Sequence, residues 1–280
     1  MQTGESEFSG VRETRLCRRW WLPDGDPCAA VVIMHGLRDH SARYDPLANA
    51  LVEAGVAVHA FDLRGHGKSD GARVWVEAFD DYVDDLDAFL KLVATQVPGK
   101  PLFLFGHSMG GAIATLTTLT RKPVLAGLVL SAPALTPGED VPPFLITLTR
   151  LVASVLPLLP VLKLPDAAFS RVPAVVAAMV ADPLIENGPG PARTASELLK
   201  ALGRIGASME QLTTPLLLLH GTADKLTNPQ GSKSLHARAA STDKTLRLYE
   251  GWFHDLAHEP DAAMVVTEIV DWVESRATRP

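Results

Sequence analysis

The chain has 280 residues, 47% of them hydrophobic, which suffices for a sizeable core in a single α/β domain with an insertion. Its 26 basic and 32 acidic residues give a net charge of −6, which argues against a general nucleic-acid-binding surface. The two cysteines, Cys17 and Cys28, lack metal-ligand spacing, so we expect free thiols rather than a disulfide.

The first ten residues, MQTGESEFSG, are polar and lack the basic and apolar regions of a secretory signal. We therefore expect a cytoplasmic protein. An apolar stretch at residues 141–165 raises the alternative of peripheral attachment to a membrane.

Strand-like and helix-like runs alternate through the first part of the chain. Short apolar runs predict strands, and an apolar period that stops at Gly55 predicts a helix ending there. We expect strands at residues 15–23, 29–36 and 56–67, and a helix at residues 45–55.

Residues 76–97 have the period of an amphipathic helix. Five apolar residues share one face: Phe79, Val83, Leu86, Leu90 and Val93. The other face carries five aspartates without the spacing of metal ligands: Asp80, Asp81, Asp84, Asp85 and Asp87. We therefore expect a solvated face near the helix N-terminus rather than a cation site.

The same alternation continues after residue 100. We expect strands at residues 101–105, 125–135, 215–224 and 244–251, a helix at residues 110–121, and a closing helix from Asp261. Strands that alternate with helices in this way indicate a largely parallel central sheet, flanked by helices on both faces.

The rhythm of strands stops between Thr136 and Met209. This region contains many prolines and helical apolar runs but no strand pattern. It predicts a helical cap inserted between two strands of the core. We therefore expect residues 1–135 and 210–280 to form the core, and residues 136–209 to form the cap.

The apolar stretch at residues 141–165 reads VPPFLITLTRLVASVLPLLPVLKLP. A membrane-spanning helix needs about 20 apolar residues without interruption. Here Arg150 lies inside the stretch, and Pro157 and Pro160 would break a helix. We expect a lid helix, which is either buried or partly exposed and in transient contact with membranes or micelles.

The segment Gly106-His107-Ser108-Met109-Gly110 fits the pattern G-x-S-x-G between an apolar strand and a helix. In this motif a serine lies on a strained turn whose neighbours must be small. The turn exposes the serine oxygen and directs the first N–H groups of the helix toward it. Ser108 is the candidate nucleophile.

A serine nucleophile needs a histidine base that is held by an acid. In folds with this turn the chain order is serine, acid, histidine. Asp224 follows the strand PLLLLHG, and His254 follows the strand KTLRLYEG. Both therefore lie at carboxyl ends of strands, where open α/β sheets collect their functional groups. Asp224 is the candidate acid and His254 the candidate base.

Other acids and histidines are weaker candidates. Asp255 is a rival acid, but adjacent residues generally point apart, and His258 is a rival base about one helical turn after His254. The remaining histidines near strand ends are expected to pack or to support neighbouring groups; these are His35, His107 and His220.

Two backbone N–H groups are expected to form an oxyanion hole. One belongs to Met109, directly after the nucleophile, and the other to Leu37, in the loop after the third strand. This chemistry requires no metal and no organic cofactor.

Six segments together resemble a known family: HGLRDHSARYDPLANAL, FDLRGHGKSDG, GHSMGGAIA, LSAPAL, PLLLLHGTADKL and FHDLAHEP. They are similar to segments of the monoacylglycerol lipases, which are serine hydrolases of the α/β-hydrolase superfamily. The resemblance covers the chain from about Arg15 to Ser275, and the segments occur in the same order. The serine turn alone is common to the superfamily. The combination of H-G-x-x-[DE]-H-S-x-R-Y with G-H-G-x-S-x-G is particular to this family and its lysophospholipase-like relatives.

The resemblance implies the α/β-hydrolase fold and gives Ser108, Asp224 and His254 the roles of nucleophile, acid and base. By the same match, Leu37 and Met109 resemble the oxyanion donors of the family. Asp39 and Arg43 match an acidic residue and an arginine near the polar head pocket, or else form a salt bridge that holds the loop; both interpretations stay open.

Three positions depart from the family pattern. Arg38 stands where glycine is common, Ala257 where some members carry a head-group histidine, and His258 where others often carry asparagine. These departures concern the substrate rather than the hydrolase chemistry.

The resemblance and the candidate residues predict a serine hydrolase that cleaves monoacylglycerol, a small lipid ester, into fatty acid and glycerol through an acyl-enzyme. The alternatives are a broader carboxylesterase, a lysophospholipase, or an amide or carbamate hydrolase with the same three residues. A ligand-binding receptor that retains the fold is a further alternative. Dehalogenases and epoxide hydrolases are disfavoured, because they have an aspartate nucleophile where this chain has Ser108.

Overall fold

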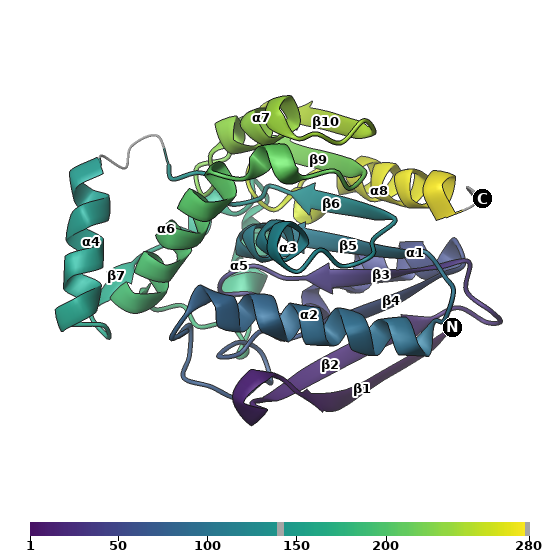
Figure 1. Cartoon of the computed structure of the whole chain (residues 1–280), viewed down its shortest axis with the longest axis horizontal. Coiled ribbons are helices and arrows are strands. Elements are labelled where there is room, and N and C mark those ends of the chain that lie inside the picture. The colour runs from purple at the N-terminus through teal and green to yellow at the C-terminus, as the bar shows by residue number, and fades with distance from the viewer. Residues whose placement is uncertain (139–142, 278–280) are drawn as a thin grey trace.

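The computed structural model describes residues 1–138 and 143–277 of the chain. Within them an eight-stranded sheet has the order β1-β2-β4-β3-β5-β6-β9-β10 (Figure 1). The six strands from β4 to β10 in this order pair in parallel, whereas β2 pairs antiparallel with both β1 and β4. The predicted largely parallel sheet is confirmed.

The strands of this sheet are β1 (Gln2–Ser9), β2 (Arg15–Leu22), β3 (Ala29–Met34), β4 (Val56–Phe61), β5 (Leu102–His107), β6 (Gly127–Ser131), β9 (Leu216–Gly221) and β10 (Lys244–Tyr249). The helices around it are α1 (Asp45–Glu53), α2 (Phe79–Gln96), α3 (Met109–Thr120), α7 (Pro229–Arg238) and α8 (Ala262–Ala277). Cys17 and Cys28 are both free thiols, as expected.

Two buried apolar clusters lie on the two faces of the sheet. Residues of α2 and α3 build one cluster, and residues of α1 and α8 build the other (Figure 1). In β3, Val32 belongs to the first cluster and Val31 and Ile33 to the second. Because successive side chains of a strand point to opposite faces, a strand covered on both sides is apolar throughout.

Two elements of the core were not predicted from the sequence. Strand β1 is polar and alternates between exposed and half-buried residues, so it lacks the apolar run that marks an inner strand. It is held by its antiparallel pairing with β2. Helix α7 begins after Asn228, whose side chain accepts a hydrogen bond from the Gln230 amide as an N-cap.

The prediction of a solvated aspartate face on α2 is wrong for two of its five residues. Asp85 is fully buried and accepts hydrogen bonds from Arg64 Nε at 2.7 Å and from the Val11 amide at 2.8 Å. Asp81 is also buried and pairs with Arg12 at 2.9 Å. The turn between β1 and β2 covers this part of the helix, which the sequence pattern of α2 alone does not reveal. No cluster of potential metal ligands occurs among the described residues.

The chain leaves the sheet after β6 and returns at β9, and we call residues 132–215 the β6–β9 segment. Its helices are α4 (Pro143–Val155), α5 (Pro173–Ala181) and α6 (Ala192–Gly206), and a short pair of strands joins β7 (Pro160–Leu162) to β8 (Gly190–Pro191). This pair lies where no strand was expected. Residues 139–142, which include the first two residues of the predicted apolar stretch, lie outside the described residues.

Helix α4 lies at the far end of the β6–β9 segment, beyond α6 as seen from the sheet (Figure 1). Its outward side chains are strongly exposed for apolar residues, with Phe144 at 70%, Leu151 at 62% and Val155 at 71%. Among the residues that the structure describes, no helix has the length and apolar character needed to cross a membrane.

Candidate active site

Ser108 lies on the turn between β5 and α3 with φ 55° and ψ −123°, a conformation that non-glycine residues rarely adopt. Main-chain hydrogen bonds hold this turn. The Ser108 amide donates to the Ser131 carbonyl at 3.1 Å, and the Ser108 carbonyl accepts from the Ala134 amide at 2.9 Å. The side chain takes no part in these bonds, so its oxygen is available for chemistry.

The glycines of the turn are required by close backbone packing. A Cβ atom at Gly110 would lie 2.3 Å from the carbonyl oxygens of Met34 and His35. A Cβ atom at Gly106 would lie 2.7 Å from the carbonyl oxygen of Gly110. The small residues around Ser108 therefore let α3 start directly against the end of β3.

We expect Gly110→Ala to lower the free energy of unfolding by about 3 kcal/mol, because the new methyl group meets backbone atoms that cannot rotate away. Urea denaturation measures this change. Gly203→Ala in α6 is the matched control, since nothing lies within 4 Å of its Cβ position. There the same change should stabilise the protein by about 0.5–1 kcal/mol. Equal effects at both positions would contradict the packing argument.

Asp224 and His254 lie in the loops after β9 and β10, and their side chains meet. His254 Nδ1 and Asp224 Oδ2 are 2.8 Å apart, and both side chains are buried. Asp224 Oδ1 accepts the Leu226 and Thr227 amides at 2.7 and 3.0 Å, which fixes the plane of the carboxylate. His254 can donate to a carboxylate only from a protonated Nδ1, so Nε2 is left as a proton acceptor.

The Asp224 carboxylate is ionised despite its burial. Burial opposes its charge, but the neighbouring His254 and hydrogen bonds from His220 and His254 outweigh burial and hold the pKa of Asp224 far below its usual range. His220 Nε2 lies 3.2 Å from Asp224 Oδ2, and its Nδ1 lies 2.7 Å from Ser232 Oγ. The expectation that His220 supports neighbouring groups fits this position.

Within the described residues no hydrogen bond joins the Ser108 side chain to His254, although the residue before Ser108 lies close to the base. The ring of His107, the residue before Ser108, lies 4.8 Å from the ring of His254 between centroids. Burial lowers the pKa of His107 to about 4, so this ring adds no positive charge beside the base at neutral pH. Hydrogen bonds between a nucleophile and its base commonly tighten only when substrate is bound.

The loop after β3 lies directly against Ser108. A Cβ atom at Gly36 would lie 2.9 Å from Ser108 Cβ and 3.4 Å from Ser108 Oγ. Leu37 follows in this loop, and within the described part of the chain its amide has no backbone acceptor. The Met109 amide belongs to the first turn of α3, where N–H groups lack an acceptor in the helix. Of the two predicted oxyanion donors, Met109 thus directly follows the serine, and Leu37 directly follows the glycine that packs against it.

Asp39 and the partly buried Arg43 form an ion pair that extends to the histidine loop. Arg43 Nη1 donates to Asp39 Oδ1 at 3.1 Å, and Arg43 Nη2 donates to Asp255 Oδ2 at 2.9 Å. Tyr44 donates its hydroxyl proton to Asp39 Oδ2 at 2.8 Å. This geometry favours the interpretation of a salt bridge that holds the loop.

Asp255 and His258, the rival acid and base, bind each other rather than His254. His258 Nδ1 lies 2.9 Å from Asp255 Oδ1, and the other carboxylate oxygen accepts from Arg43. Burial disfavours the charged form of His258, but Asp255 more than offsets it and raises the pKa of His258. His35 makes a different contact. Its Nε2 accepts a hydrogen bond from the Leu63 amide at 2.9 Å, which links the loops after β3 and β4.

Comparison with known proteins identifies the family to which this chain belongs. A family model described as serine aminopeptidase, S33, matches residues 25–261. The chain is 37% identical to a monoacylglycerol lipase of Mycolicibacterium smegmatis over 97% of both chains. It is 38% identical to the monoglyceride lipase of Homo sapiens, over 92% of this chain and 86% of the human protein. The chain belongs to the monoacylglycerol lipase family of serine hydrolases.

A solved monoacylglycerol lipase also shares its structure. The crystal structure of the Paleococcus ferrophilus monoacylglycerol lipase matches with a TM-score of 0.83 and 30% identity, covering 99% of this chain and 100% of that one. The predicted resemblance and the α/β-hydrolase fold are therefore confirmed.

In this monoacylglycerol lipase family member, Thr227 also lies at the candidate active site, although the sequence analysis did not predict it. Its hydroxyl lies 2.7 Å from Asp224 Oδ2, 3.3 Å from His254 Nδ1 and 3.0 Å from the Ala132 carbonyl oxygen. The signal was present, because a threonine three residues after a loop aspartate can fold back onto its carboxylate.

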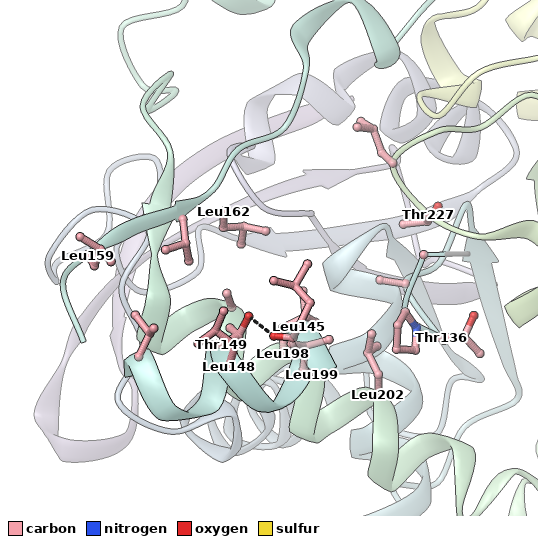
Figure 2. A pocket seen from close by; sticks show the side chains of 17 residues that line it. Thr136, Leu145, Leu148, Thr149, Leu159, Leu162, Leu198, Leu199, Leu202 and Thr227 are labelled. Atoms are coloured by element: carbon pink, nitrogen blue, oxygen red, sulfur yellow. Dashed lines mark hydrogen bonds between the residues drawn. The ribbon is translucent and has the colours of Figure 1, made fainter. Parts of the chain in front are cut away.

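A cavity of about 400 Å³ opens between α4, α6 and the loops after β6 and β9 (Figure 2). Leucines of both helices line it, and Figure 2 shows Leu145 and Leu148 of α4 near Leu198 and Leu199 of α6. The cavity reaches Thr227, which contacts Asp224, and Ala134, whose amide donates to the Ser108 carbonyl. It therefore brings an apolar volume to the residues that surround Ser108.

Proposed function

We propose that the protein hydrolyses monoacylglycerols to fatty acid and glycerol, with Ser108 as nucleophile, His254 as base and Asp224 as acid. The observation that carries this proposal is the leucine-lined cavity that reaches Thr227 and Ala134, in a chain of the monoacylglycerol lipase family. An apolar volume beside a serine hydrolase site favours an ester with a fatty acyl chain.

The reaction follows from the arrangement of donors and acceptors. His254 Nε2 takes the Ser108 proton as Oγ attacks the ester carbonyl, and the resulting oxyanion accepts the Leu37 and Met109 N–H groups. Protonated His254 then gives its proton to the leaving glycerol oxygen, and an acyl-enzyme remains. Water, deprotonated by His254, attacks this acyl-enzyme and releases the fatty acid.

The acyl chain would lie in the cavity beneath α4. Each methylene group that it buries contributes about 0.8 kcal/mol of binding free energy. We propose that residues 136–209 act as the cap that supplies this surface. The exposed outer side chains of α4 support transient contact with membranes or micelles, from which such a substrate would be taken up.

An aminopeptidase-like activity is the alternative that the name of the matching family model suggests. Such an enzyme must bind the ammonium group of its substrate, usually with a free carboxylate. Two carboxylates beside the site, those of Asp39 and Asp255, are both paired with Arg43. The cavity itself is lined mainly by aliphatic side chains. These observations favour the ester.

A substrate panel tests the proposal. Monoacylglycerols of increasing chain length, lysophospholipids, nitrophenyl esters and aminoacyl amides should be compared by kcat/KM under identical conditions. We expect monoacylglycerols with medium or long chains to be preferred and amides to be inert. Preference for an amide or a lysophospholipid over every monoacylglycerol would refute the substrate assignment.

Filling the cavity should shorten the preferred acyl chain. Leu198→Trp places an indole in the cavity and is expected to lower kcat/KM for long-chain monoacylglycerols about 30-fold, while a butyryl ester changes less than about twofold. Val124→Trp, at a position 94% exposed between α3 and β6 and outside the cavity lining, is the matched control and should leave the chain-length profile unchanged. A uniform loss across all chain lengths in Leu198→Trp would argue against an acyl site here.

A further inference from the structure

Arg38 connects the loop that follows β3 to distant parts of the β6–β9 segment. It directly follows Leu37, is only 3% exposed, and has φ 55°. A residue with a side chain costs about 1–3 kcal/mol in this left-handed region unless its surroundings hold it there. Interactions of Arg38 with its surroundings must therefore offset this free-energy cost.

The guanidinium group of Arg38 makes four hydrogen bonds across this boundary. Nε donates to the Glu186 carbonyl at 2.7 Å, and Nη1 donates to the Leu164 carbonyl at 3.1 Å. Nη2 donates at 2.9 Å to both Asp166 Oδ1 and Asn187 Oδ1. Two separate stretches of the β6–β9 segment thus converge on one side chain of the loop after β3.

The part of the segment held by Arg38 also lies against the candidate base. Phe169, Met179 and Ile185 form a small buried cluster in it. The Phe169 ring lies 5.8 Å from the His254 ring between centroids, and the Phe169 carbonyl accepts the Asp255 amide at 2.8 Å. The four bonds of Arg38 therefore anchor the elements that cover His254 as well as the loop that carries Leu37.

We propose that Arg38 is a positioning residue that couples the β6–β9 segment to the Leu37 oxyanion donor. Its four bonds hold the peptide after Leu37 in the left-handed turn and so keep the Leu37 amide directed toward Ser108. When these bonds are lost, the turn relaxes and the donor moves. This inference rests on the proposed hydrolysis at Ser108 with Leu37 as an oxyanion donor.

Two substitutions, Arg38→Lys and Arg38→Gly, test this coupling in the full-length enzyme. Arg38→Lys keeps the charge but lacks the planar fork of donors, and Arg38→Gly removes the donors while relieving the strained φ. With nitrophenyl butyrate, we expect kcat to fall about 30-fold in both variants and KM to change less than about twofold. Arg73→Gly, an exposed arginine outside the site, is the matched control.

The affinity for a trifluoromethyl ketone inhibitor distinguishes a positioning role of Arg38 from a purely structural one, because a loss of stability alone would leave this affinity unchanged. This inhibitor forms an oxyanion on the serine, so its affinity should fall by the same factor as kcat. Guanidinium ion should partly restore the activity of Arg38→Gly. Unchanged kcat and inhibitor affinity with a lower Tm would overturn the proposal, and so would a rise in KM for long-chain substrates alone.

A second variant covers the case in which position 38 does not tolerate change. Asp166→Ala combined with Asn187→Ala removes the two side-chain acceptors of Nη2 at partly or fully exposed positions. We expect an intermediate loss of kcat, about fivefold, and no loss at all would overturn the coupling. Because nitrophenyl butyrate reports these effects, an enzyme that ignores monoacylglycerol fails only the substrate assignment.

Discussion

Ser108→Ala is expected to lower kcat by about five to six orders of magnitude, for monoacylglycerol and for nitrophenyl butyrate alike. The substitution removes the attacking oxygen and with it the acyl-enzyme route. The amides of Leu37 and Met109 and the acyl cavity remain, so the residual rate should still exceed that of water alone.

The fold should survive this substitution. The hydrogen bonds that hold the turn come from the main chain of Ser108, to Ser131 and from Ala134, and alanine makes the same bonds. Reaction with a fluorophosphonate probe, circular dichroism and thermal unfolding test both statements. We expect no labelling and a Tm within about 2 °C of the parent. Ser275→Ala, an exposed serine on α8, should retain labelling and activity. Full labelling of Ser108→Ala would reject Ser108 as the nucleophile.

The parts of the fold that the sequence predicted are those governed by local pattern. Strands β3 and β5 are short apolar runs, and a buried parallel strand leaves that signature because helices cover both of its faces. Strand β1 has no such run, because its stability comes from pairing with β2 at the sheet edge. The buried state of Asp85 likewise depends on Arg64 and Val11, which contact it only in the folded chain.

The candidate site shows the same division. Motif and chain order predicted Ser108, Asp224 and His254 as the catalytic residues, and the structure brings the last two within hydrogen-bond distance. The surroundings were not predictable, because they combine residues from distant segments. Arg38 bonds to residues more than a hundred positions away, and no local pattern marks such partners.

Asp224→Asn should lower kcat about 10⁴-fold while leaving the site assembled. The environment dictates how the new amide is oriented. The Leu226 and Thr227 amides both donate to Oδ1, so the carbonyl oxygen of asparagine must take that place. Its NH₂ group then faces His254 Nδ1, which must present a lone pair in order to accept. The His254 proton moves to Nε2, and the nitrogen that should deprotonate Ser108 is no longer a base.

Single-turnover kinetics with nitrophenyl butyrate measure this loss, and Asp255→Asn is the matched variant. Asp255 adjoins His254 and is also buried, but its carboxylate binds Arg43 and His258. We expect Asp255→Asn to lose less than about tenfold in kcat. A larger loss than in Asp224→Asn would identify Asp255, rather than Asp224, as the catalytic acid.

A pH titration of stability adds an independent check. A carboxyl whose pKa is lowered by folding stabilises the protein above its unfolded-state pKa and loses that contribution as pH falls. Asp224→Asn should therefore lose less stability on acidification than the parent, because it lacks the group responsible.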